Sequence, residues 1–251
     1  MDKKKADSPS IPFNNLDFLH SREARPIRII SEYIDPEVRF SKNGVHHTVV
    51  FFGSARIKED KNSAMGRFYW DAEELAFRIA SWSKKLKEEN NKIFVCTGGG
   101  PGIMEAANRG ADRAGEKTIG LNIQLPFEQH PNPYISPELN MEFHYFYMRK
   151  LWFLYQSKAL IAFPGGYGTL DELFESLTLI QTQKVEKGNL PIVLFGTDFW
   201  KKLVNFEQMA DLGLISPEDL SLFKFCDTVD EAYDYLIPRI EKLTKEVNSI
   251  L

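Results

Sequence analysis

Short apolar runs that alternate with amphipathic stretches constrain this chain more than any other feature of its sequence. The apolar runs lie at 48–52, 93–96, 118–123, 159–163 and 191–195. Polar and apolar residues do not alternate within them, as is typical of strands covered on both faces. Apolar residues at helical spacing fill the stretches 66–88, 102–114, 146–157, 169–184, 199–210 and 229–246. This order predicts an α/β fold: a Rossmann-like doubly wound parallel sheet with helices on both faces.

The chain of 251 residues is long enough for one large core, so we expect a single nucleotide-binding domain over 21–251. Residues 1–20 carry few apolar anchors, and we expect them to be flexible. A helical extension is predicted from Ser21, and Asp35-Pro36 is expected to interrupt it. The apolar residues that set its spacing are Ile27, Ile30 and Ile34.

Composition excludes several classes of protein. The 31 Lys and Arg against 35 Asp and Glu leave a net charge of −4, which argues against a nucleic-acid partner. The two cysteines, Cys96 and Cys226, form neither a disulfide framework nor a CxxC motif, so no metal site is expected. We find neither a signal peptide nor the roughly 18 apolar residues of a membrane helix. A cytoplasmic protein without a membrane partner is expected.

Glycine-rich turns follow three of the predicted strands. The residues concerned are Gly53 and Ser54 after the first, Gly98, Gly99 and Gly100 after the second, and Gly165, Gly166, Gly168 and Thr169 after the fourth. Ligands of such sheets bind beyond the carboxyl ends of the strands. Glycine allows a close approach of the backbone, and the start of the next helix offers free N–H groups to an anion. The turns therefore predict a pocket for a phosphorylated ligand.

The common cofactor motifs do not fit these turns. The dinucleotide motif fails because Ile103 stands where its third glycine belongs, and no Gly-Lys-Ser/Thr of a Walker loop follows either glycine cluster. A mononucleotide or a sugar phosphate remains.

Each turn residue also has a purely structural interpretation. Glycines after strands often only turn the chain, and Thr169 with Glu172 fits a capping box. Arg149-Lys150 fits a solvated pair at a helix end. The convergence of two anion-suited turns, a carboxylate and a basic pair at one edge favours a binding site.

A longer motif carries a family resemblance. The segment Pro164-Gly165-Gly166-Tyr167-Gly168-Thr169-Leu170-Asp171-Glu172, preceded by Met148-Arg149-Lys150, resembles the signature of the Lonely Guy (LOG) family. These are cytokinin riboside 5′-monophosphate phosphoribohydrolases, often labelled lysine decarboxylases. The likeness covers roughly residues 47–205, and the extended amino terminus resembles the longer bacterial branch. It implies hydrolysis of a nucleoside 5′-monophosphate, AMP or an N6-modified AMP, to free base and ribose 5-phosphate.

The resemblance also implies roles for individual residues. Arg149 and Glu172 match the catalytic residues, and Glu128 matches a substrate-contacting Glu. Thr178 lies in the matched helix, and Lys150 joins the substrate-binding set. The glycines of the 165–168 turn with Thr169 match the phosphate loop. The family further implies a homodimer or a higher homo-oligomer, for which the apolar helix 146–157 is a candidate interface.

The residue types suit this chemistry. Cleavage of an N-glycosidic bond develops positive charge on the ribose, which an ionised Glu172 would stabilise while it orients or deprotonates water. Arg149 cannot give up a proton and would clamp phosphate or balance the departing base. No lysine lies in a setting typical of pyridoxal phosphate, so we reject decarboxylation and expect no cofactor. The alternative is a non-catalytic carrier of a nucleotide or of molybdenum cofactor; the presence of both Arg149 and Glu172 favours the enzyme.

Overall fold

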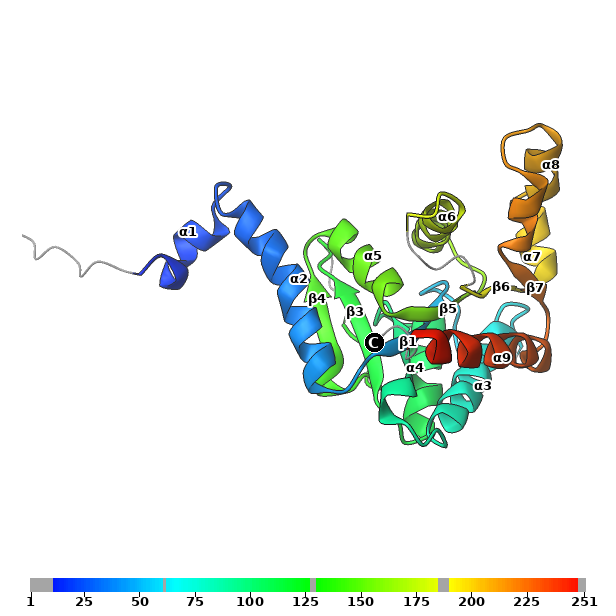
Figure 1. Ribbon diagram of the computed structural model, residues 1–251, viewed down its shortest axis with the longest axis horizontal. Coiled ribbons are helices and arrows are strands. Elements are labelled where there is room, and N and C mark those ends of the chain that lie inside the picture. Colours follow the sequence, from blue (N-terminus) through cyan, green and yellow to red (C-terminus); the bar gives the residue numbers. More distant parts are fainter. Residues whose placement is uncertain (1–10, 61, 127–129, 185–189, 248–251) are drawn as a thin grey trace, which may run out of the picture.

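Seven parallel strands form one sheet in the order β4-β3-β2-β1-β5-β6-β7 (Figure 1). The computed structural model describes residues 11–60, 62–126, 130–184 and 190–247. The strands are β1 (His47–Phe52), β2 (Ile93–Thr97), β3 (Thr118–Ile123), β4 (Asn140–Phe143), β5 (Ser157–Ala162), β6 (Ile192–Phe195) and β7 (Lys224–Cys226). The predicted fold class is confirmed.

Helices cover both faces of the sheet. One face carries α2 (Arg25–Lys42), α5 (Phe146–Tyr155), α6 (Tyr167–Gln181), α7 (Thr197–Leu203) and α8 (Phe206–Asp211). The other carries α3 (Arg67–Ser83), α4 (Ile103–Arg113) and α9 (Val229–Val247), as Figure 1 shows. Successive residues of β1 point to opposite faces, so Val50 and Phe52 join the first core while Val49 and Phe51 join the second. This double burial explains why the central strands are apolar throughout.

Short elements complete the chain. They are η1 (Pro12–Asn14), α1 (Leu16–His20), η2 (Glu89–Asn91), η3 (Pro137–Leu139) and η4 (Pro217–Ser221). η1 and α1 lie in the segment that we expected to be flexible, and they extend away from the sheet (Figure 1).

The structure corrects the predicted elements at three places. The edge strands β4 and β7 were missed because they are half-exposed and lack an apolar run, whereas β6, also four residues long, is buried throughout. The predicted helix at 199–210 is two helices, α7 and α8. The chain breaks between them at Asn205, whose side chain accepts a hydrogen bond from the Gln208 N–H (3.0 Å) and so caps α8.

The third correction concerns Pro36, which does not interrupt the helix: α2 continues through it to Lys42. A proline inside a helix lacks the N–H that would bond to the carbonyl four residues earlier. That carbonyl belongs to Glu32, and it accepts a hydrogen bond from the indole Nε1 of Trp152 in α5 (3.0 Å). The bond that proline removes is thus replaced by a tertiary contact.

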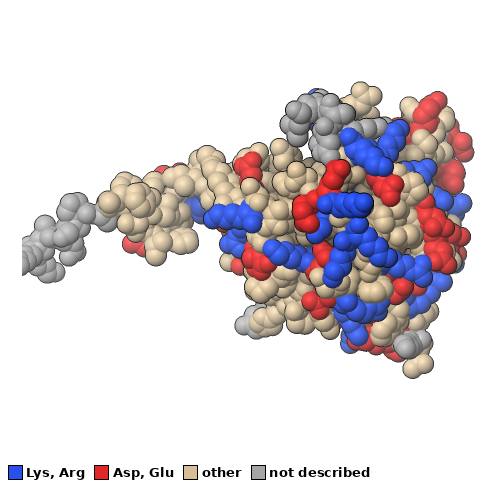
Figure 2. Space-filling model, turned by 60° about the horizontal axis from the view of Figure 1, so that its bottom comes forward, with Lys and Arg blue, Asp and Glu red and all other residues tan. Residues whose placement is uncertain are grey.

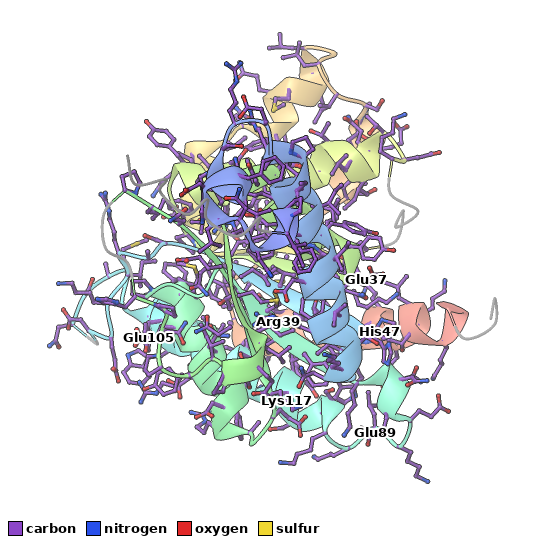
Figure 3. All side chains as sticks on the ribbon, turned by 90° about the vertical axis from the view of Figure 1, so that its left-hand side faces the viewer. Glu37, Arg39, His47, Glu89, Glu105 and Lys117 are labelled. Atoms are coloured by element: carbon purple, nitrogen blue, oxygen red, sulfur yellow. The ribbon has the colours of Figure 1, made fainter. Side chains whose placement is uncertain are left out.

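The Glu32 side chain makes a second connection to α5. Its carboxylate oxygens accept hydrogen bonds from the backbone N–H groups of His144 (2.7 Å) and Tyr145 (3.2 Å), directly before the first turn of α5. Further along α2, Arg39 Nη1 donates to the carbonyl oxygen of Asn140 in β4 (3.4 Å); Figure 3 views the molecule from this side. The helical extension therefore fixes where α5 begins.

Trp152→Phe tests the replacement of the lost helix bond. The variant leaves the Glu32 carbonyl without a partner and should lower the free energy of unfolding by about 1–3 kcal/mol. Pro36→Ala should restore stability in the Trp152→Phe background more than in the wild type, because its N–H can then bond to Glu32. Urea unfolding of the four proteins measures this coupling. Equal effects of Pro36→Ala in both backgrounds would contradict the account.

Candidate functional site at the carboxyl edge of the sheet

The turns after β1, β2 and β5 meet at one point. β1 lies between β2 and β5, so the strand order reverses here, at the position where doubly wound sheets bind ligands. The Ser54 N–H donates to the carbonyl oxygen of Pro164 after β5 (3.0 Å), and the Ser54 carbonyl accepts from the Ile103 N–H at the start of α4 (3.1 Å). The backbone of Ser54 thereby joins the turn after β1 to both neighbouring turns.

Two glycines allow this close packing. A Cβ on Gly53 would lie 2.6 Å from Cγ2 of Ile103, which leaves no space for a side chain. Gly102 has a φ of +71°, and a Cβ there would overlap the Ser54 carbonyl oxygen. At these two positions glycine is needed so that the turns can touch.

Buried polar side chains hold the Gly98–Gly100 turn. Thr97 Oγ1 accepts a hydrogen bond from the Gly99 N–H (2.9 Å), and Asn132 Nδ2 donates to the carbonyl oxygens of Gly99 and Gly100 (both 3.1 Å). Asn132 also donates to Asn108 Oδ1 (2.9 Å). These supporting residues could not be predicted from the sequence, because an Asn in a polar loop and an Asn in a helix give no local signal of a shared network.

Arg149 and Glu172 form a buried ion pair beside these turns. Arg149 Nη2 of α5 lies 3.1 Å from Glu172 Oε1 of α6, and the exposed fractions of the two side chains are only 9% and 12%. The guanidinium lies near the rings of Phe146 and Phe153 (5.3 and 5.4 Å from their centroids). Its Nη1 is 3.7 Å from where a Cβ on Gly98 would lie. Arg149 Nε is buried and has no hydrogen-bond partner among the described residues.

Burial sets the protonation of this pair. It raises the pKa of Glu172 to about 7 against the opposing effect of Arg149, and Asp171 raises that pKa further. Burial likewise lowers the pKa of Arg149, while Glu172 and Asp171 raise it. A carboxyl group that gains and loses its proton near neutral pH is suited to general acid–base chemistry.

The capping-box interpretation of Thr169 and Glu172 is wrong. α6 begins at Tyr167, its N-cap residue is Gly166, and no side chain caps it. Thr169 is buried within the first turn, and its side chain fills the space that a Cβ on Gly165 would occupy. Glu172 pairs with Arg149 instead, so the first N–H groups of α6 stay without a side-chain cap.

The other predicted site residues lie at several different places along α5 and α6. Lys150 Nζ lies 3.2 Å from Asp171 Oδ1 and also pairs with Glu175, so its charge neutralises carboxylates of α6. Thr178 lies beyond Glu172 in α6 and is exposed, and its hydroxyl donates to the Phe174 carbonyl oxygen (2.7 Å). Gly166 and Gly168 are exposed at the start of α6. Glu128 lies outside the described residues.

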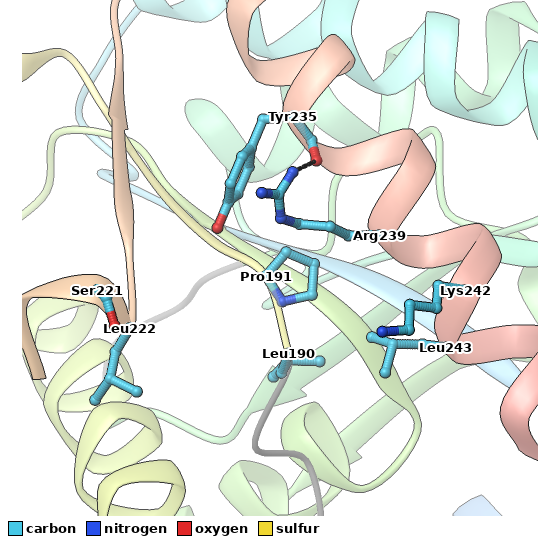
Figure 4. Close-up of a pocket in the computed structure, with 8 residues that line it drawn as sticks. All are labelled: Leu190, Pro191, Ser221, Leu222, Tyr235, Arg239, Lys242 and Leu243. Carbon is cyan, nitrogen blue, oxygen red and sulfur yellow. Dashed lines mark hydrogen bonds between the residues drawn. The ribbon is translucent and has the colours of Figure 1, made fainter. Parts of the chain in front are cut away.

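A separate cavity of about 330 Å³ opens near the start of β6 (Figure 4). Leu190 and Pro191 line it from before the strand, with Tyr235 and Arg239 from α9. Arg239 lies over the Tyr235 ring (3.9 Å) and donates to the Tyr235 carbonyl oxygen (2.9 Å). None of the residues predicted from the glycine turns lines this cavity.

The described ranges, 11–60, 62–126, 130–184 and 190–247, contain neither a metal-binding cluster nor a helix that could span a membrane. No group of three or more His, Cys, Asp or Glu side chains there is placed to hold a metal ion. Among the helices of the described part, none is long and apolar enough to cross a membrane.

The fold and the site together define a Rossmann-like protein with glycine-rich turns at one edge of its sheet and a buried Arg149–Glu172 ion pair beside them. A family model described as "Possible lysine decarboxylase" matches residues 104–236. The chain belongs to this family, the LOG family, which confirms the resemblance seen in the sequence.

Curated relatives share moderate identity with the chain. A probable cytokinin riboside 5′-monophosphate phosphoribohydrolase of Oryza sativa subsp. japonica is 29% identical over 167 residues, which cover 62% of this chain and 74% of the relative. A cytokinin riboside 5′-monophosphate phosphoribohydrolase of Arabidopsis thaliana is 28% identical over 156 residues, which cover 61% and 68%.

Among solved structures, the molybdenum cofactor (Moco) carrier protein of Chlamydomonas reinhardtii has a similar fold. Its TM-score is 0.53 at 22% identity, and the match covers 78% of this chain and 98% of that protein.

The charges around Glu172 allow a direct test of its environment. In the wild type, the carboxyl group should titrate near pH 7. Lys150→Gln should raise its pKa, because Lys150 favours the ionised form, and Asp171→Asn should lower it. NMR of carboxyl-labelled protein, assigned with Glu172→Gln, measures the three midpoints. A midpoint near the ordinary Glu value of about 4.3, unmoved by either variant, would show that Glu172 is solvated.

Proposed function

We propose that the protein hydrolyses the N-glycosidic bond of a nucleoside 5′-monophosphate, AMP or an N6-modified AMP of the cytokinin type. The products would be the free base and ribose 5-phosphate. The observation that carries this proposal is the buried Arg149–Glu172 pair, which lies beside the meeting point of the glycine turns. The names of the curated relatives support the same activity.

The reaction needs a carboxylate at the sugar. The C1′–N bond breaks, its electron pair goes to the base, and positive charge develops on the ribose. Ionised Glu172 stabilises that charge and takes a proton from the water whose oxygen bonds to C1′. The leaving base takes up a proton from solvent, and Glu172 afterwards returns the proton of the attacking water to solvent, so the elements of one water are divided between the two products. Arg149 stays charged and orients Glu172 through their ion pair.

A carrier function is the second candidate, since proteins of similar fold are named molybdenum cofactor carriers. A carrier would use the turns as an anion site but would gain nothing from a carboxyl group that titrates near pH 7. The buried pair therefore favours hydrolysis.

The partner that we propose is a second copy of the chain. α2 leaves an apolar seam exposed on the side away from the sheet core, and α5 exposes a second apolar group beside it. The seam consists of Ile27, Ile30, Ile34 and Val38, and the group of Phe146, Tyr147, Leu151 and Tyr155. Figure 2 shows few charged side chains on the arm that ends in α1. A seam with near-heptad spacing fits the same seam of a second copy, in a two-fold arrangement.

Base release tests the hydrolysis. Purified protein is incubated with a panel of monophosphates, including AMP and isopentenyl-AMP, and free base is followed by chromatography. Glu172→Gln and Arg149→Ala should each lower turnover at least about 100-fold. The first variant removes the carboxylate that takes the proton from water, and the second removes the ion-pair partner of that carboxylate. Circular dichroism should show that both variants fold. Glu207→Gln on α8 is the matched control and should keep wild-type turnover.

No base release from any monophosphate, combined with tight binding of one, would replace the proposal with the carrier function. Unfolding of both variants would instead assign the pair a structural role.

Light scattering during gel filtration tests the partner. The wild type should elute at twice the chain mass or a multiple of it, and Ile30→Glu with Ile34→Glu should shift it to the monomer, since charges would face each other across the seam. Leu212→Glu, at an exposed leucine after α8, is the control and should leave the mass unchanged. A monomeric wild type would refute the proposed assembly.

A further inference from the structure

A cavity of about 450 Å³ opens at the point where the strand order reverses. The turn after β1 and the turn after β5 line it from two sides, and α7 closes a third. The lining includes Ser54, Arg56, Lys58, Pro164, Gly165 and Phe199. Its volume is within the usual range for small-molecule sites, about 300–1,000 Å³.

Two cations of this lining are not neutralised by an ion pair. Arg56 and Lys58 are exposed, and no carboxylate of the described residues lies within 4 Å of either. The other basic residues near the site differ, since Arg149 pairs with Glu172 and Lys150 with two carboxylates. Asp60 also lines the cavity and offsets part of the charge; its Oδ1 accepts a hydrogen bond from the Asn62 N–H.

The start of α6 adds to the positive field. Gly165 belongs to both the cavity lining and the turn that leads into α6, a helix of 15 residues. No side chain caps that helix, so its first N–H groups stay available at the end where the helix dipole is positive. Cations and helix start thus act on the same small volume.

The resemblance to the LOG family already implies that the 165–169 turn holds the 5′-phosphate of the substrate. We propose that Arg56 and Lys58, which line the same cavity as Gly165, are the cationic ligands of that phosphate. The inference rests on the proposed function and deepens it. The glycine turns supply shape and N–H groups, whereas Arg56 and Lys58 supply the charge that separates a monophosphate from a nucleoside. Arg149 then lies beside the sugar and the base, because its guanidinium is paired with Glu172 and not with the phosphate.

Steady-state kinetics with AMP and with adenosine test this assignment. Arg56→Gln and Lys58→Gln should each raise the KM for AMP about tenfold and leave kcat within a few-fold, because a charged hydrogen bond to the phosphate is lost. The slower hydrolysis of adenosine should not change. Arg56→Lys should recover part of the loss. Arg239→Gln, at an exposed arginine in the cavity near the start of β6, is the matched control and should keep the wild-type KM.

Calorimetric titration with AMP and with adenosine separates this inference from the proposed function. The double variant combines Arg56→Gln with Lys58→Gln. If the wild type releases base and this double variant binds AMP as tightly as the wild type does, the phosphate lies elsewhere and the inference fails. If the wild type releases no base, the proposed function fails; loss of AMP binding in the double variant would still support the phosphate site, and unchanged AMP binding would overturn it.

Discussion

The backbone of Ser54 is the contact on which the candidate site depends. Its N–H bonds to the turn after β5 and its carbonyl to the start of α4, so the turns at three strand ends keep one relative position. This is possible only because Gly53 and Gly102 lack side chains at the points of contact. A ligand that touches one of these turns is therefore within reach of the other two. The strand order brings the three turns to one edge of the sheet, and the glycines allow their backbones to come into contact there.

The helical extension contributes to the same site from outside the matched family region, which begins at residue 104. The Glu32 carboxylate accepts hydrogen bonds from the backbone directly before α5. The Glu32 carbonyl oxygen, which Pro36 cannot bond, accepts a hydrogen bond from the Trp152 indole. Since α5 carries Arg149, the extension helps to set where the guanidinium meets Glu172. The apolar seam on the outer side of the same helix would link this support to subunit assembly.

Local signals explain how much of this was predictable. The five strands with continuous apolar runs and the glycine turns could be predicted because their pattern lies within a few residues. The continuity of α2 through Pro36 could not, because the group that replaces the lost bond is Trp152, 120 residues from Glu32. The partners of Lys150 were equally hidden, since they depend on how α5 packs against α6. Glu172 fitted two local roles, and only burial against Arg149 decides between them.

The most direct measurement of the central claim is a crystal structure with ribose 5-phosphate, the product that the proposed reaction releases. The account predicts that the phosphate lies between the start of α6 and Arg56, and that C1 of the sugar faces the Glu172 carboxylate within hydrogen-bond reach of one water. A sugar whose C1 points away from Glu172, or a phosphate bound in the Arg239 cavity near the start of β6, would contradict it.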